Sequence, residues 1–365
     1  MRWIGRVEGA HERMNLRQQK EDLLNLLQKA VELELATIPP YMTALLSIKP
    51  GTNRAAADII RSVMMEEMLH LALVGNLMNS LGGAVRLEKD NIPSYPLQLE
   101  FEGKPFKDRK FEVHLAPYSR ETIETFIKIE LPAGLAPLEI ELEAIEEIAV
   151  PALTIGDFYR RIVQSLEEMC TLYSESEVFV GNRATQVGPQ FFWGASGRPI
   201  IVSNLNDAKA AIDIVVRQGE GADLSNASGE TPYFSKPENY AHYFRFKEIV
   251  ANRKYQINDS PYGPPQGESL NVDFEAVYPI VTDPAWRQYQ PGSVIAHLDS
   301  SYNRQYSTML KQIELAFNGS PDLLYEAITN GMHGLTSIAL EMMHTPVSAD
   351  CGKTGAPSYE WVELP

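Results

Sequence analysis

The fold is decided by residues 62–78, which read SVMMEEMLHLALVGNLM. Apolar residues recur there at helical spacing, and Glu67 and His70 share the apolar face, three residues apart, where two helical side chains can meet. A buried carboxylate without a partner is costly, so this face of the helix requires a compensating group.

One compensation in helical bundles is metal binding. Paired-metal carboxylate proteins use one Glu from each of two helices and a Glu-x-x-His set from each of the other two, all pointing inward. The alternative is a core histidine that hydrogen-bonds a neighbouring glutamate. Residues 67–70 alone leave both interpretations open.

Composition limits the other possibilities. The 365 residues include 48 acidic and 32 basic ones, and the formal charge of −16 argues against nucleic-acid binding. No apolar leader and no bilayer-length apolar run appear, so no membrane contact and a cytoplasmic location are expected. Cys170 and Cys351 make neither a disulfide framework nor a cysteine-based zinc site.

A first long helix is predicted over residues 15–48. Glu34 lies on its apolar face, whereas Glu32 points away, so Glu34 is the inward carboxylate and a candidate bridging metal ligand. Pro39-Pro40 should bend or break the helix one turn later. The alternative role for Glu34 is bonding to backbone groups freed at that bend.

Three further long helices are expected around the motif. Residues 55–81 form the second helix, and the third begins after Thr154, with Asp157 on the face opposite its apolar residues. The fourth starts near Pro237 and carries His242 on its apolar face. In that helix Glu238 can reach the same side as His242.

The remaining segments are interpreted as caps over the helical bundle and as a C-terminal extension of it. Residues 84–150 and 175–235 are expected to cap the metal end of the bundle and shape a substrate pocket. Residues 1–258 would form the bundle with these caps, and residues 259–365 a linker and a helical pair packed on it. A second Glu-x-x-His set in that pair, Glu341 to His344, is predicted to face solvent.

Four motifs resemble one family. They are ELELATIPPY at 32–41, EEMLH at 66–70, TIGDFY at 154–159 and AHYFRFKEI at 241–249. They look like the ferritin-like proteins related to the iminophenyl-pyruvate dimer synthase of violacein-type bisindole biosynthesis. The resemblance implies a mainly α, ferritin-like four-helix bundle with an irregular or β insertion and an extra C-terminal helix pair. It also implies a non-haem metal centre used in bacterial secondary metabolism.

The resemblance implies ligands at Glu34, Glu67, His70 and His242 for two iron ions, with manganese as the alternative metal. The family commonly has Glu at the position of Asp157, and an acidic residue at the position of Asn239. A complete two-metal centre would therefore need a carboxylate from Asp157, Glu167 or Glu238; otherwise one site would bind weakly. Tyr41, Tyr159 and Tyr243 are candidate hydrogen-bond donors to the ligands, or else core residues.

Three functions follow as hypotheses. The leading one is an O2-dependent non-haem di-metal oxidase or oxygenase that acts on a small amino-acid-derived metabolite. The second is oxidative coupling of imino acids supplied by a partner oxidase. The third is a metal-free helical scaffold with a buried polar network. The expected partners are a small-molecule substrate, O2, a partner oxidase and a second copy of the chain.

Overall fold

A computed structural model describes residues 15–101, 110–132, 149–150, 154–192, 194, 196–219, 233–235, 240–285 and 288–364. The chain is mainly α, as predicted. The helices are α1 (Leu16–Ser47), α2 (Arg54–Ser80), α3 (Arg120–Ile129), α4 (Ile155–Leu172), α5 (Glu175–Val178), α6 (Leu205–Gly219), α7 (His242–Ala251), α8 (Val294–Phe317), α9 (Leu323–Glu326) and α10 (His333–His344). A π-helical segment, Ala327–Met332, joins α9 to α10, and short 3₁₀ turns lie at Lys89–Asn91, Arg183–Thr185, Pro189–Phe191 and Tyr233–Ser235.

The helices α1 and α2 form the central pair of the molecule. They pack along each other, and their bounds confirm the first two predicted helices. The Asn15 side chain begins α1 by accepting from the Gln18 N–H. After α2, Gly82 adopts a φ of +84°, and the Gly83 N–H returns to the Met78 carbonyl, so the glycines end the helix as expected.

Pro39 and Pro40 do not break α1, so the break, one of the two expected effects, does not occur. The helix continues through both residues to Ser47. Pro40 has no N–H to give to the Ala36 carbonyl, but the Tyr95 hydroxyl donates to that carbonyl at 2.8 Å. A side chain from outside the helix therefore replaces a missing backbone hydrogen bond and allows the helix to continue.

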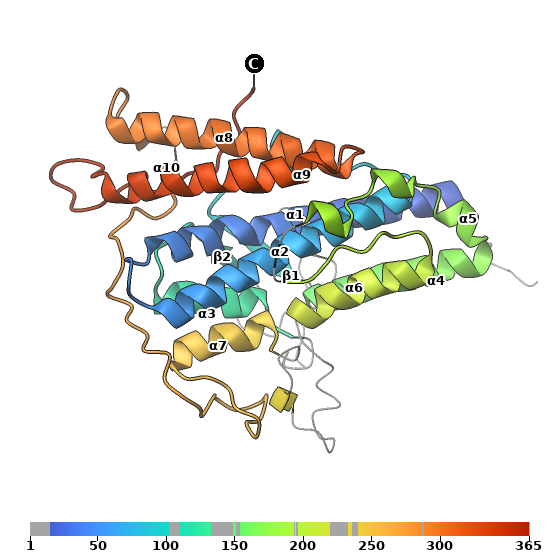
Figure 1. Cartoon of the computed structure of the whole chain (residues 1–365), viewed down its shortest axis with the longest axis horizontal. Helices are drawn as coiled ribbons and strands as arrows, with labels where there is room; N and C mark the ends of the chain where they lie inside the picture. The colour runs from blue at the N-terminus through green and yellow to red at the C-terminus, as the bar shows by residue number, and fades with distance from the viewer. Residues whose placement is uncertain are drawn as a thin grey trace, which may run out of the picture.

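A second layer covers one face of the central pair. It consists of α3 packed on α7 and α4 packed on α6, and Figure 1 shows these two helix pairs beneath opposite ends of α1 and α2. The third predicted helix is confirmed as α4. The fourth is described only from Tyr240 onward, as α7, and its predicted start at Pro237 falls outside the described residues.

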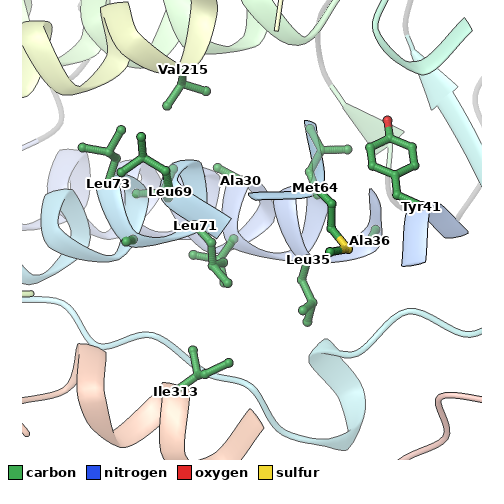
Figure 2. Close-up of a cluster of buried hydrophobic side chains, with 14 of the residues drawn as sticks. Ala30, Leu35, Ala36, Tyr41, Met64, Leu69, Leu71, Leu73, Val215 and Ile313 are labelled. Atoms are coloured by element: carbon green, nitrogen blue, oxygen red, sulfur yellow. The ribbon is translucent and has the colours of Figure 1, made fainter. Parts of the chain in front are cut away.

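A third layer, made of α8, α9 and α10, covers the other face of the central pair (Figure 1). Figure 2 shows both faces of the central pair: Leu35 and Leu71 point toward Ile313 of α8, and Leu69 and Leu73 point toward α6. The consecutive residues 69–78 of α2 are all buried, as a helix between two layers requires. Gly75 allows α8 to approach, since a Cβ there would lie 3.0 Å from the Phe317 ring.

The two segments expected to be caps contribute helices to the second layer, because α3 lies in residues 84–150 and α6 in 175–235. The first segment also holds a small sheet of β1 (Leu97–Phe101), β2 (Lys110–Val113) and β3 (Ala149–Val150), in the order β2-β1-β3. Strands β1 and β2 are antiparallel, with Leu97 opposite Val113, and β3 runs parallel to β1. Among the described helices, none is both long and apolar enough to cross a membrane.

The role of Tyr95 in α1 can be tested by removing its hydroxyl. We expect Tyr95→Phe to lower the free energy of unfolding by about 1–2 kcal/mol, because the Ala36 carbonyl loses its donor inside the protein. Urea unfolding would measure this change. Tyr262→Phe, at a side chain that is 64% exposed, is the matched control and should change stability little. Equal stability of Tyr95→Phe and wild type would contradict this account of the proline-containing helix.

Candidate metal centre

Five buried side chains meet between the central pair and the second layer, and we call them the Glu–His cluster. Glu34 comes from α1, Glu67 and His70 come from α2, Glu130 follows the last residue of α3, and His242 is the first residue of α7. Each is at most 4% exposed. Four helices therefore bring three carboxylates and two imidazoles out of water at one place.

The Glu–His cluster divides into two groups that share Glu67. Glu34, Glu67 and His70 form one group, and Glu67, Glu130 and His242 form the other; the candidate ligand atoms of each group lie within 4.8 Å of one another. His70 Nδ1 is 3.3 Å from Glu34 Oε2 and 3.4 Å from Glu67 Oε2. His242 Nδ1 is 2.9 Å from Glu67 Oε1 and 3.4 Å from Glu130 Oε2. Each oxygen of Glu67 thus serves a different histidine.

The outer nitrogens of the two imidazoles already have partners. His70 Nε2 lies 2.9 Å from the Gln218 Oε1 atom of α6, and His242 Nε2 lies 2.8 Å from Glu66 Oε2. Glu66 is itself held by the guanidinium of Arg245. Both partners are acceptors, so each Nε2 carries a proton and each Nδ1 is left to face the carboxylates, with a proton of its own when no metal is bound and with its lone pair when one is. This orientation suits metal ligation by Nδ1.

Two tyrosines donate to the outer carboxylates. The Tyr159 hydroxyl of α4 donates to Glu34, and the Tyr41 hydroxyl donates to Glu130 Oε1 at 2.6 Å. Burial, together with the charge of the facing carboxylate, raises the pKa of both hydroxyls well above the ordinary tyrosine value, so both remain protonated donors. Tyr243, the third candidate, instead packs on Phe244.

The cluster shifts the pKa values of its own members in different directions. Burial raises the pKa of Glu34 to about 7 against the hydrogen bond from His70, and burial with the charge of Glu67 raises that of Glu130. Burial alone would raise the pKa of Glu67, but His242 and His70 hold it well below its usual range. Burial alone would lower the histidine pKa values, but the carboxylates raise that of His70 to about 10 and that of His242 well above normal.

The donor set fits a cation. His242 Nδ1 is buried and close to two carboxylates, yet it makes a hydrogen bond with neither. A buried polar atom without a hydrogen bond is poorly satisfied by the protein alone. A divalent ion would satisfy Nδ1 and both oxygens together, and it would offset the charge of three neighbouring carboxylates.

Of the six predicted ligands, four lie in the Glu–His cluster, one lies elsewhere, and one falls outside the described residues. It brings Glu34, Glu67, His70 and His242 together, and Glu67 rather than Glu34 is the carboxylate shared by the two groups. Asp157 is a correction: it lies in the first turn of α4 and pairs with Arg160 at 2.5 Å, away from the cluster. Glu238 falls outside the described residues.

Other predicted positions are also resolved. Glu167 pairs with Lys209 on the surface at 2.5 Å and does not supply the missing carboxylate. The second Glu-x-x-His set is confirmed as exposed, at Glu341 and His344. Helical phase therefore separated the inward and outward copies of the same four-letter motif.

Sequence reasoning missed Glu130 and Glu66. Ile123, Phe126 and Glu130 lie three and four residues apart, so the helical spacing already placed Glu130 on the apolar face of α3. Residues 84–150 were interpreted as a cap on the bundle, so Glu130, which follows the last residue of a short helix in that segment, was not considered as a ligand. Glu66 gave no such signal, because its partners His242 and Arg245 come from a helix distant in sequence.

Comparisons with known proteins agree on one broad family. A ferritin-like family model matches residues 27–251. Among solved structures, a ferritin-like protein from Caulobacter vibrioides matches with a TM-score of 0.59 and 23% sequence identity, over 94% of this chain and 99% of that one. At that identity the likeness shows the fold alone. No curated protein matches. The narrower resemblance to the bisindole-pathway synthase stays a prediction.

The pKa shifts predict how stability depends on pH without metal. The raised pKa of His70 gives stability that is complete below about pH 6.5 and is lost as the pH rises through about 10; the raised pKa of Glu34 acts in the same direction through about 7. We therefore expect metal-stripped protein to lose up to about 1.4 kcal/mol per pH unit from the Glu34 proton between about pH 4.5 and 7, and from the His70 proton between about pH 6.5 and 10.

Urea unfolding of chelator-treated protein at several pH values would measure this slope. His70→Gln should flatten it, whereas His344→Gln, at an exposed histidine, should leave it unchanged. A slope equal to wild type in His70→Gln would show that His70 does not carry the proton.

Proposed function

The chain belongs to the ferritin-like family, and from that premise we propose that it is a non-haem di-metal, O2-dependent oxidase or oxygenase. The observation that carries the proposal is the pair of three-donor groups that share Glu67. Carboxylate oxygens and imidazole nitrogens suit Fe(II), and also Mn(II), better than they suit soft metals. We therefore infer two iron ions as the cofactor, with manganese as the alternative.

Each metal ion would have its own ligands and one ligand shared with the other ion. Glu34 and His70 would hold one ion, Glu130 and His242 the other, and Glu67 both. Iron bound there would supply the electrons and the open coordination position that reaction with O2 requires. Gln218 and Glu66 fix the imidazole rings through Nε2, which keeps each Nδ1 directed at the centre.

The protein surroundings would then control protons and water. The Tyr159 and Tyr41 hydroxyls hold protons at Glu34 and Glu130, and they fix the direction of those carboxylates. The near-complete burial of the Glu–His cluster excludes bulk water from the groups around the metals. Exclusion of water protects a reactive centre from side reactions, which is what oxidation of a bound substrate requires.

We infer the substrate class from the resemblance of the four motifs, which span α1, α2, α4 and α7. The resemblance indicates that the substrate is a small amino-acid-derived metabolite. A more specific form of the same proposal is the oxidative coupling of imino acids that a partner oxidase supplies. A metal-free scaffold is disfavoured, because it would keep His242 Nδ1 buried without a hydrogen bond. It would also leave the charge of three buried carboxylates to be offset only by the protons that the cluster itself binds.

The shared ligand makes a stoichiometric prediction. We expect wild type from iron-supplemented cells to bind two metal ions per chain, one in each group. His70→Ala and His242→Ala should each lose one ion, and Glu67→Ala should lose both because both groups use it. Elemental analysis of the purified proteins would measure this.

The second Glu-x-x-His copy provides the matched controls for this experiment. Glu341→Ala and His344→Ala make the same chemical changes on the surface, and Asp157→Ala removes the rejected ligand. All three should keep the wild-type metal content. Equal losses in the inward and outward copies would contradict the assigned faces.

The oxidase proposal predicts O2 consumption that depends on substrate. Protein loaded anaerobically with Fe(II) and then mixed with O2 should develop a ligand-to-metal absorption band. It should also consume O2 faster when an aromatic amino acid or its imine is present. Glu67→Ala should do neither, and Glu341→Ala should behave as wild type. Metal-loaded wild type that shows neither the band nor any O2 uptake would exclude the proposed activity while leaving the metal centre intact.

A further inference from the structure

An open groove lies where the C-terminal end of α1 and the first turns of α2 face α10, and we call it the hairpin groove. Its volume is about 760 Å³, a size that accommodates a small molecule. Figure 1 shows the connection between α1 and α2 at the same end of the molecule as the C-terminal end of α10. None of the five residues of the Glu–His cluster lines the groove.

The floor of the hairpin groove is apolar and partly uncovered. Leu46, Met65, Met332 and Leu340 line it, and all four side chains are only half-buried. Two further methionines, Met42 and Met64, lie beside them, and unbranched methionines adjust to different ligand shapes. An apolar surface gathered in one concave place favours a ligand that removes it from water.

Positive charge predominates at the rim of the groove. Its charged lining residues are Lys49, Arg54, Asp58 and Arg61, and all four are exposed. Arg61 pairs with Asp58 at 2.7 Å, whereas Lys49 and Arg54 pair with no carboxylate in the part of the chain that the structure describes. In a chain with a formal charge of −16, two unpaired cations beside an apolar floor are complementary to an anion.

The segment that carries these two cations is fixed by another part of the chain. The Lys49 N–H donates to the Ala276 carbonyl at 3.0 Å. The side chain of Asn53, next to Arg54, donates to the Asp273 carbonyl at 2.8 Å and accepts from the Asp273 N–H at 2.7 Å. The backbone beside both cations is therefore in place before a ligand arrives, which lowers the entropic cost of binding.

We propose that the hairpin groove binds an amphipathic monocarboxylate, a molecule with one carboxylate group and an apolar chain. The carboxylate pairs with Lys49 and Arg54, and the apolar chain covers the half-buried leucines and methionines of the floor. An inorganic anion would leave the floor in water, and a neutral apolar molecule would leave both cations unpaired. The site uses none of the candidate metal ligands and is independent of the proposed oxidase activity.

Three probes test the two parts of the proposal. Octanoate and 1-octanol share an apolar chain, and only the first is charged, whereas acetate has the charge without the chain. Full-length protein with methyl-labelled methionine would be titrated with each probe at low salt and followed by NMR. We expect octanoate to shift the signals of Met64 and Met65 and to leave that of Met169, in α4, in place.

The affinities should rank in the order octanoate, 1-octanol, acetate. Octanoate should bind about fivefold more tightly than 1-octanol, since two exposed ion pairs each contribute modestly. Raising the salt concentration should reduce this preference, because salt screens exposed charges. Acetate should bind too weakly to shift the methionine signals, because it cannot cover the floor.

Variants separate recognition of the charge from contact with the floor. Lys49→Gln and Arg54→Gln should each weaken octanoate about twofold without changing 1-octanol, and the double variant should remove the preference. Lys29→Gln, at an exposed lysine of α1 outside the groove, is the matched control and should behave as wild type. Thr336→Phe fills the groove from α10, so it should weaken both probes while leaving the metal content unchanged.

Three results would overturn the proposal. The first is the absence of shifts at Met64 and Met65 with octanoate. The second is equal affinity for octanoate and 1-octanol in wild type at low salt, which would show an apolar groove that does not recognise an anion. The third is a preference for octanoate that survives in the double variant of Lys49 and Arg54. None of these results depends on O2 consumption, so failure of the oxidase proposal would leave this test intact.

Discussion

The structure depends on the burial of the Glu67 carboxylate. Its two oxygens face two different imidazoles, His70 from its own helix and His242 from α7, and it is 3% exposed. Desolvation of such a group demands partners from several directions, and in a helical protein these come from different helices. Satisfying Glu67 therefore requires α7 to dock on α2. Glu130, beside His242, requires α3 to end at the same place.

The central pair can carry this cluster because it is covered on both sides. One face of α1 and α2 is committed to carboxylates and histidines, and the opposite face packs on α8 and α10 through apolar residues such as Leu35 and Leu71. A two-layer bundle would have left that face in water. The third layer makes α1 and α2 a core element, and the Tyr95 bond to Ala36 extends α1 through its two prolines as part of that core.

Helical phase predicted most of the candidate site, because Glu34, Glu67 and His70 lie within long, periodic helices. Glu34, Glu67, His70 and His242 were placed on inward faces in that way, whereas the ferritin-like, mainly α fold was expected from the resemblance of four motifs to one family. Asp157 was included by resemblance to a family pattern, although its phase pointed outward, and the structure agrees with the phase.

Glu130 was missed because the end of a short helix is the least certain part of a periodic pattern. Gln218 and Glu66 depend on contacts between helices far apart in sequence, which no local pattern contains.

The Glu–His cluster lies at the ends of helices, and the partial charges of those ends make the electrostatic potential at the cluster more negative. Glu130 follows the last residue of α3, and Gln218 is in the last turn of α6, so two helix C-termini approach the site. Of the described helices that supply residues of the Glu–His cluster, α7 begins there, with His242. A helix C-terminus carries partial negative charge, and two of them beside three carboxylates outweigh the partial positive charge at the start of α7. The backbone therefore reinforces the side chains: both make the centre strongly negative, and both favour its occupation by protons on the histidines or by metal cations that replace those protons.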